Sequence, residues 1–199
     1  MNKLFTITIL LFSVIAIAQN PKVPSTMYIG DMKLEISASG QKKIQSHVDS
    51  YRRSPTYFQK KVHLANLYFP IIEAKFKEEN VPDAYKYLII QESGFVSDAV
   101  SSSNAVGFWQ FKEATGKEVG LTINSKVDER KNISEASRAA AKYFKFTNQY
   151  FSNWIYALQA YNQGAGGAQK DTDSKYYGKK RMPITGKTHW YVLKFLAHV

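Results

Sequence analysis

The chain has 199 residues, of which 44% are hydrophobic and 14% aromatic, so it is long enough for one folded domain and too apolar for a disordered protein. It contains no cysteine, which excludes a disulfide scaffold, a thiolate metal site and a cysteine nucleophile. The 27 Lys and Arg residues against 16 Asp and Glu give a net charge of +11, which favours an anionic partner such as a nucleic acid, a membrane surface or a cell-wall polymer.

The start of the chain has the pattern of a secretory signal. Lys3 precedes an apolar run that ends in the small residues Ala16 and Ala18. This pattern predicts a signal peptide at residues 1–18 that is cleaved after Ala18. A membrane anchor is the alternative, but the run is shorter than the roughly 20 residues of a spanning helix. We therefore expect an exported protein, periplasmic or secreted, with no stable membrane insertion after cleavage.

The remaining residues divide into a partly helical N-terminal extension at 19–61 and a main domain at 62–199. Residues 20–40 mix proline, glycine and polar residues, which is typical of an irregular lead-in. From Gln41 onward, apolar residues recur at helical spacing. Nothing in the sequence repeats, so we expect a single domain with this extension.

Periodicity and capping signals predict helices along the main domain. Pro70 lies inside an apolar helical pattern and should bend it. Asn132 followed by Glu135 resembles a capping box at a helix start. No alternating strand pattern stands out, so the predicted fold class is all-α. Two of the expected helices have a predicted start but no predicted end, and these begin at Gln41 and just after Asn132. The other expected helices are Pro55 to about Glu79, Pro82 to Glu92, Trp154 to Gly164 and Trp190 to Ala197. Loops are expected at Ser97–Gly107 and Lys170–Pro183.

The helix that starts near Pro82 carries a candidate catalytic acid. Its spacing places Glu92 on one face with three apolar residues, Tyr85, Leu88 and Ile89. Burial and the negative end of the helix dipole both raise the pKa of a carboxyl group in that position. A carboxyl group that stays protonated near neutral pH suits general acid catalysis. From spacing alone, a solvated or lysine-paired glutamate at a helix end remains the alternative.

Separated sequence blocks follow Glu92 in a characteristic order. Glu92-Ser93 precedes a serine-rich loop at 101–110, which contains Ala-x-Gly and ends in Gln, and then Ala-Tyr-Asn-x-Gly at 160–164. This set resembles the lytic transglycosylases, the murein-cleaving enzymes related to goose-type lysozyme. Asp-x-Arg at 128–130 and Thr-x-Trp-Tyr-Val at 188–192 resemble the branch typified by membrane-bound murein transglycosylase D. The resemblance covers roughly the whole main domain.

The resemblance implies a lysozyme-like fold and cleavage of the β-1,4 bond between N-acetylmuramic acid and N-acetylglucosamine, with formation of 1,6-anhydromuramic ends. Glu92 matches the single catalytic acid of the family. Tyr161 would either stack on a sugar or hydrogen-bond to Glu92, and Tyr161-Asn162 also fits a helix C-cap. Neither a cofactor nor a metal is implied. The residues that match the family's substrate-binding positions are Ser101, Ser103, Gln110, Tyr161 and Asn162.

Other functions remain open at this stage. A muramidase that hydrolyses the same bond would need a positioned water and usually a second carboxylate, for which Asp98 is the best placed acid. A non-catalytic peptidoglycan-binding module would have lost Glu92. A nucleic-acid binder would cluster its basic residues, which here are spread along the chain. We therefore expect a monomer that acts on peptidoglycan glycan strands and binds no nucleic acid, with Asp128 and Arg130 as a structural ion pair.

Overall fold

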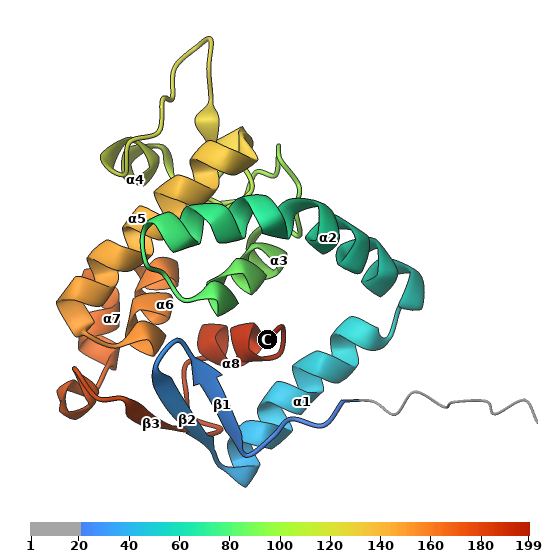
Figure 1. Cartoon of the computed structure of the whole chain (residues 1–199), viewed down its shortest axis with the longest axis vertical. Coiled ribbons are helices and arrows are strands. Elements are labelled where there is room, and N and C mark those ends of the chain that lie inside the picture. The colour runs from blue at the N-terminus through green and yellow to red at the C-terminus, as the bar shows by residue number, and fades with distance from the viewer. Residues whose placement is uncertain (1–20) are drawn as a thin grey trace, which may run out of the picture.

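The computed structural model describes residues 21–199, so the signal peptide predicted at residues 1–18 lies outside the described residues. The described chain is mostly helical (Figure 1). In chain order its helices and strands are β1 (Thr26–Ile29), β2 (Met32–Ile36), α1 (Ala38–Arg52), α2 (Pro55–Glu78), a 3₁₀ turn (Asp83–Tyr87), α3 (Leu88–Glu92), α4 (Glu113–Glu118), a 3₁₀ turn (Glu129–Lys131), α5 (Ile133–Phe151), α6 (Trp154–Gln163), α7 (Ala165–Asp171), a 3₁₀ turn (Ser174–Tyr176), β3 (Arg181–Ile184) and α8 (Trp190–Leu196).

A small sheet corrects the all-α prediction. β1 pairs antiparallel with β2, and β2 pairs parallel with β3, so a segment near the start of the described chain is joined to one near its end. The core face of β2 consists of Met32, Leu34 and Ile36, which are at most 4% exposed. The polar residues between them are more exposed, so this short strand has the alternation that a half-buried strand requires.

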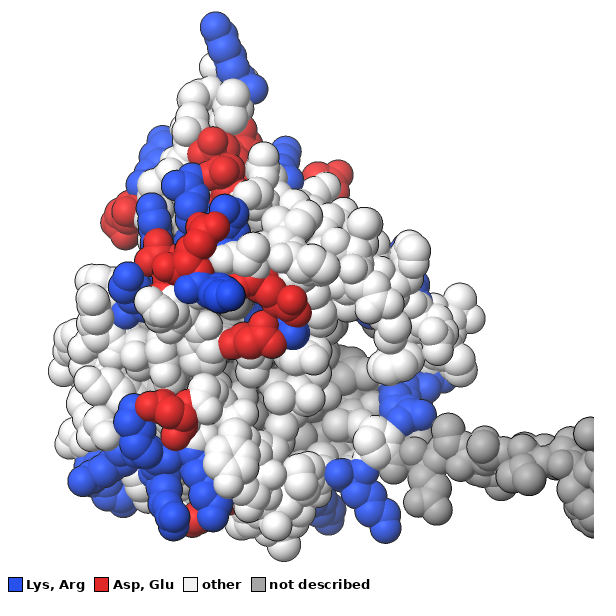
Figure 2. Space-filling model, viewed as in Figure 1, with Lys and Arg blue, Asp and Glu red and all other residues white. Residues whose placement is uncertain are grey.

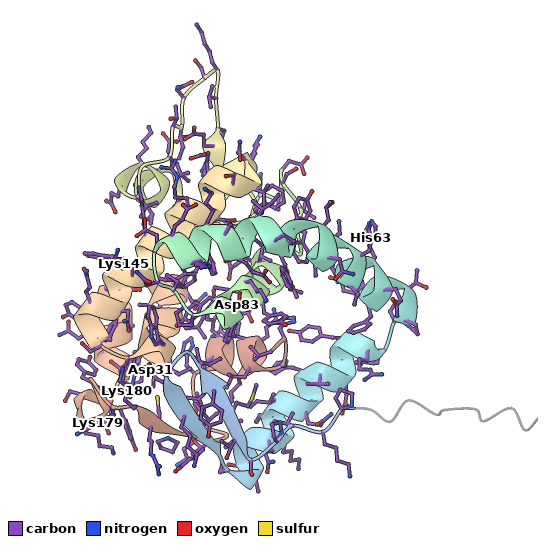
Figure 3. The ribbon with its side chains drawn as sticks, viewed as in Figure 1. Asp31, His63, Asp83, Lys145, Lys179 and Lys180 are labelled. Atoms are coloured by element: carbon purple, nitrogen blue, oxygen red, sulfur yellow. The ribbon has the colours of Figure 1, made fainter. Side chains whose placement is uncertain are left out.

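A surface ion pair lies at the edge of the sheet. Lys180, just before β3, pairs with Asp31 in the turn between β1 and β2, and the two labelled side chains lie together in Figure 3. Leu34 of the expected extension is fully buried in one core cluster with Ile184 and other residues of the expected main domain. The boundary expected between residues 61 and 62 falls inside α2. The division into extension and main domain stays a prediction.

Side-chain caps fix where several helices begin. The Asn132 side chain accepts from the backbone N–H groups of Ser134 and Glu135, which confirms the predicted helix start. The Glu135 side chain pairs with Arg138, which is not the contact of a complete capping box. The predicted loop at 170–183 is wrong in part, because it contains the end of α7, a 3₁₀ turn and most of β3.

α3 occupies the centre of the molecule, with α2 curving above it and α8 below it in Figure 1. The segment expected as one helix from Pro82 is a 3₁₀ turn followed by the short α3. Tyr85, Leu88 and Ile89 are nonetheless fully buried, as their shared face predicted. The Tyr85 hydroxyl donates to the carbonyl of Trp154 at the start of α6. These contacts fix the position of Glu92, the last residue of α3.

Candidate active site

A cavity of about 560 Å³ opens at the C-terminal end of α3. We call it the cleft. Its walls come from α3, the serine-rich loop, α6 and α8. The structure brings together all of the site residues that the sequence predicted, because the cleft is lined by Glu92, Ser101, Ser103, Gln110, Tyr161 and Asn162.

Glu92 lies in an environment that favours its protonated form. Burial raises the pKa of its carboxyl group to about 7, from an ordinary value of 4.5. Two contacts from α8 oppose this rise: the Tyr191 hydroxyl donates to Glu92 Oε1, and the positive charge of Lys194 favours the carboxylate. With a pKa near neutrality, the same group can give up a proton and take one back.

Tyr191 and Lys194 were not predicted as site residues. Tyr191 is 2% exposed, and both residues line the cleft from α8. Their spacing of three residues on a helix places them on one face, so periodicity alone could have paired them. It could not have shown that this face meets α3, because the two helices are far apart in the sequence.

The serine-rich loop is held by its own polar groups. Ser101 Oγ accepts from the Ala105 N–H at 3.0 Å, and the Ser101 and Ser103 hydroxyls lie 3.2 Å apart. Gln110 Nε2 donates to the carbonyl oxygens of Ala99 at 3.1 Å and Gly107 at 2.9 Å. Gln110 therefore joins the two sides of the loop and also lines the cleft.

The backbone around the cleft is strained. Phe95, Asn104 and Gln110 have φ values of 69°, 61° and 52°, in the left-handed region that non-glycine residues rarely adopt. Gly107 has a φ of 84°, and a Cβ there would lie 2.0 Å from the Arg130 carbonyl oxygen. Such strain persists only where the surrounding contacts hold it.

Arg130 provides one of these contacts. It is 8% exposed and pairs with Asp128 at 2.8 Å, which confirms the predicted ion pair. Its Nη1 donates to the Phe111 carbonyl at 3.3 Å, and its own carbonyl accepts from the Phe108 N–H at 3.2 Å. The Asp128–Arg130 pair therefore supports the serine-rich loop through the backbone contacts of Arg130.

Two contacts predicted for Tyr161 and Asn162, the hydrogen bond of Tyr161 to Glu92 and the helix C-cap, are not formed. The Tyr161 hydroxyl donates to the Trp109 carbonyl at 2.7 Å, and its ring stacks on Phe144 with centroids 4.7 Å apart. The contact expected with Glu92 is made by a different tyrosine of the cleft. The C-cap of α6 is Gly164, with a φ of 77°, so the prediction of Tyr161-Asn162 as the cap is wrong.

Glu92 is the only carboxylate among the described residues that line the cleft. The cations there are Lys112 and Lys194. Asp98, the acid considered for a second carboxylate, is exposed and does not line the cleft. Within residues 21–199, no three His, Cys, Asp or Glu side chains are grouped as metal ligands would be.

The surface seen in Figure 2 has mixed charge. Acidic and basic side chains are interleaved around α5, whereas much of the surface over α2 is uncharged. Basic side chains gather near β3, where Lys179 and Lys180 are labelled in Figure 3. This face does not carry the continuous basic stripe typical of nucleic-acid binders. Among residues 21–199, no helix combines the length and apolar character needed to cross a membrane.

Comparisons with known proteins agree with the resemblance seen in the sequence. The model of the transglycosylase SLT domain family matches residues 69–183. This chain is 30% identical to membrane-bound lytic murein transglycosylase D of Escherichia coli K12 over 176 residues, which cover 85% of this chain. A putative tributyltin chloride resistance protein of an Alteromonas species is 28% identical over 103 residues, which cover 51% of this chain and 50% of that protein.

The chain spans only 39% of the length of the Escherichia coli relative. The family match nevertheless covers more than half of this chain and includes the cleft residues from Glu92 to Gly164. This chain therefore belongs to the transglycosylase SLT domain family.

Proposed function

We propose that this protein is an exported peptidoglycan lytic transglycosylase with a lysozyme-like catalytic domain at residues 62–199. It cleaves the β-1,4 bond between N-acetylmuramic acid and N-acetylglucosamine and leaves 1,6-anhydromuramic ends. The observation that carries the proposal is Glu92, a carboxyl group with a pKa of about 7 and the only one among the described residues of the cleft. Family membership and the name of the Escherichia coli relative support the same activity.

Glu92 acts first as the acid. Below its pKa of about 7 the carboxyl group holds a proton, which it gives to the glycosidic oxygen as the bond to C1 breaks. The substrate's own N-acetyl oxygen supports the positive charge that develops at C1, which replaces the second carboxylate of most glycosidases. Ser101, Ser103, Gln110 and Asn162 are uncharged hydrogen-bonding residues that orient the sugar without adding charge beside Glu92.

Glu92 then acts as the base. Now ionised, it takes the proton from the C6 hydroxyl of the muramic acid, and this oxygen attacks C1 to close the anhydro ring. No water enters the product. The hydrogen bond from Tyr191 and the charge of Lys194 stabilise the carboxylate between the two steps.

A muramidase that hydrolyses the same bond is the second candidate. Hydrolysis by the usual inverting route needs a second carboxylate that activates water. Hydrolysis by the retaining route needs a second carboxylate that acts as the nucleophile close to the acid. Among the described residues, the cleft offers only Glu92. This favours the intramolecular attack over hydrolysis. A peptidoglycan-binding module without activity would not need a carboxyl group with a raised pKa.

Substitution of Glu92 tests the assignment. Glu92→Gln keeps the shape of the side chain and removes its proton transfer, so we expect the rate of peptidoglycan cleavage to fall by several orders of magnitude, roughly 10³-fold or more. Asp98→Asn is the matched control and should leave the rate unchanged, because Asp98 is exposed outside the cleft. A Glu92→Gln variant that keeps about a tenth of the activity would show that another group transfers the proton.

A further inference from the structure

One exposed aromatic residue of the cleft has no part in the reaction described above. Trp190, the first residue of α8, lines the cleft and is 56% exposed. Within residues 21–199, it is the only large apolar side chain that is both exposed and part of the cleft wall. A single exposed aromatic residue on an open surface is ordinary, but aromatic surface inside a cleft is typical of a ligand contact.

The rest of α8 fixes the position of Trp190. This helix lies below α3 near the centre of the molecule in Figure 1. Five of the six residues that follow Trp190 in α8 are at most 4% exposed, namely Tyr191, Val192, Leu193, Phe195 and Leu196. The helix is therefore anchored in the core, and its first residue is the point where it presents a large apolar side chain to the cleft.

Trp190 is held close to the catalytic acid by its neighbour in the chain. The ring of Trp190 lies at 87° to the ring of Tyr191, with centroids 5.6 Å apart. The Tyr191 hydroxyl in turn donates to Glu92 Oε1. One aromatic side chain thus separates Trp190 from the acid, so a glycan strand bound along the cleft can contact both residues.

The other aromatic rings of the cleft wall are used in packing within the protein. The Tyr161 ring stacks on Phe144, and it also meets Tyr143 at 89° with centroids 5.4 Å apart. Phe111 is only 3% exposed. The sequence allowed Tyr161 to stack on a sugar, but Phe144 already covers one face of its ring. Trp190 therefore offers the most accessible aromatic surface of the cleft.

The chemistry of the glycan fits such a surface. A β-1,4-linked N-acetylhexosamine in its chair form carries its ring substituents around the edge, so C–H bonds project from both faces and make them apolar. An indole ring that covers one face removes this apolar area from water. The hydroxyl and N-acetyl groups at the edge stay free for polar residues of the cleft such as Asn162 and Gln163. N-acetylglucosamine also lacks the lactyl arm of muramic acid, which leaves both of its faces open.

We propose that Trp190 is a stacking platform for an N-acetylglucosamine unit of the glycan strand. The proposal rests on the proposed function and adds a binding residue to it. Trp190 stacks on a sugar whose bonds do not change in the reaction, so the contact is the same in the ground state and in the transition state. A contact of this kind tightens substrate binding and leaves the chemical step unchanged.

Kinetic measurements on purified glycan strands test the platform. Trp190→Ala should raise KM about tenfold, which corresponds to the loss of one aromatic stacking contact, with little change in kcat. Trp190→Tyr keeps an aromatic face and should restore most of the lost binding. Phe146→Ala is the matched control, because Phe146 on α5 is 62% exposed and does not line the cleft. It should leave KM unchanged.

A binding measurement tests the same contact without cleavage. The tetramer of N-acetylglucosamine is titrated into ¹⁵N-labelled protein, and the indole N–H signals are followed by NMR and assigned with the Trp190→Tyr variant. The Trp190 signal should shift, whereas that of Trp109 should not, because Trp109 is fully buried and its indole donates to Ser137.

Four results would overturn the proposal. They are an unmoved Trp190 signal, an unchanged KM in Trp190→Ala, an equal rise of KM in Phe146→Ala, and a fall in kcat alone, which would show that Trp190 acts through Tyr191. Each of them leaves the proposed function intact, since that function fails only if the wild type releases no 1,6-anhydromuramic ends.

Discussion

At the scale of the residue, Glu92 links catalysis to stability. Its carboxyl group has a pKa of about 7 in the folded protein, against an ordinary value of 4.5. As pH rises between these values, the unfolded chain loses this proton before the folded chain does. The contribution of Glu92 to the free energy of unfolding therefore falls as pH rises through this range. The burial that suits Glu92 for catalysis thus makes it a source of instability once it ionises.

Glu92→Gln should remove the destabilisation that ionised Glu92 causes at high pH. We expect the variant and the wild type to unfold with similar free energies below about pH 4, where the carboxyl group is protonated in both states. Above about pH 8 the variant should be more stable by about 3 kcal/mol, since each pKa unit corresponds to about 1.4 kcal/mol. Urea unfolding across this pH range measures the difference. A constant difference between the two proteins would contradict the raised pKa.

Tyr191 tunes the same group. Its hydroxyl donates to Glu92 Oε1 and lowers the pKa that burial has raised, so Tyr191→Phe should raise it further. We expect the alkaline limb of the kcat/KM profile to move to higher pH, and kcat to fall about tenfold, from the loss of one hydrogen bond to a charged group. Tyr143→Phe is the control, because Tyr143 lines the cleft without a hydrogen bond to Glu92. An unmoved limb in Tyr191→Phe would exclude this role.

At the scale of the element, the loop that carries the serines depends on a close backbone approach. Gly107 has a φ of 84°, and an added Cβ would collide with the Arg130 carbonyl at 2.0 Å. The Ala-x-Gly pattern of this loop is therefore a packing requirement as well as a family motif. Sequence reasoning predicted the loop, but the contact with Arg130 depends on a chain segment that follows α4.

Gly107→Ala should destabilise the protein by about 3 kcal/mol or more, because backbone strain of about 1–2 kcal/mol adds to the collision. Gly178→Ala separates the two effects. Gly178 has a similar φ of 70°, but no heavy atom lies within 4 Å of its added Cβ, so only the strain applies. Chemical unfolding of both variants provides the comparison. Equal losses would show that the contact with Arg130 is unimportant.

At the scale of the whole molecule, the sequence predicted the helices better than the sheet. Strong local signals, such as the Asn132 cap and the buried face of Tyr85, Leu88 and Ile89, were correct because they depend on neighbours in the chain. The strand at 32–36 alternates properly but is only five residues long. Its partner in β3 lies near the other end of the chain, so no local signal could reveal the pairing.

The candidate site shows the same division. The motif blocks identified the residues that line the cleft from α3, the loop and α6. The contribution of α8 to the environment of Glu92 was missed, since Lys194 and the Tyr191 hydroxyl reach it only through tertiary packing.

The central claim is that a single carboxyl group cleaves the glycan without water. Digestion of purified peptidoglycan in water labelled with heavy oxygen, followed by mass spectrometry of the fragments, tests it most directly. We predict 1,6-anhydromuramic ends that carry no label, because the attacking oxygen comes from the sugar's own C6 hydroxyl. Reducing ends that carry the heavy oxygen, with no anhydro species, would contradict the account and identify the protein as a hydrolase.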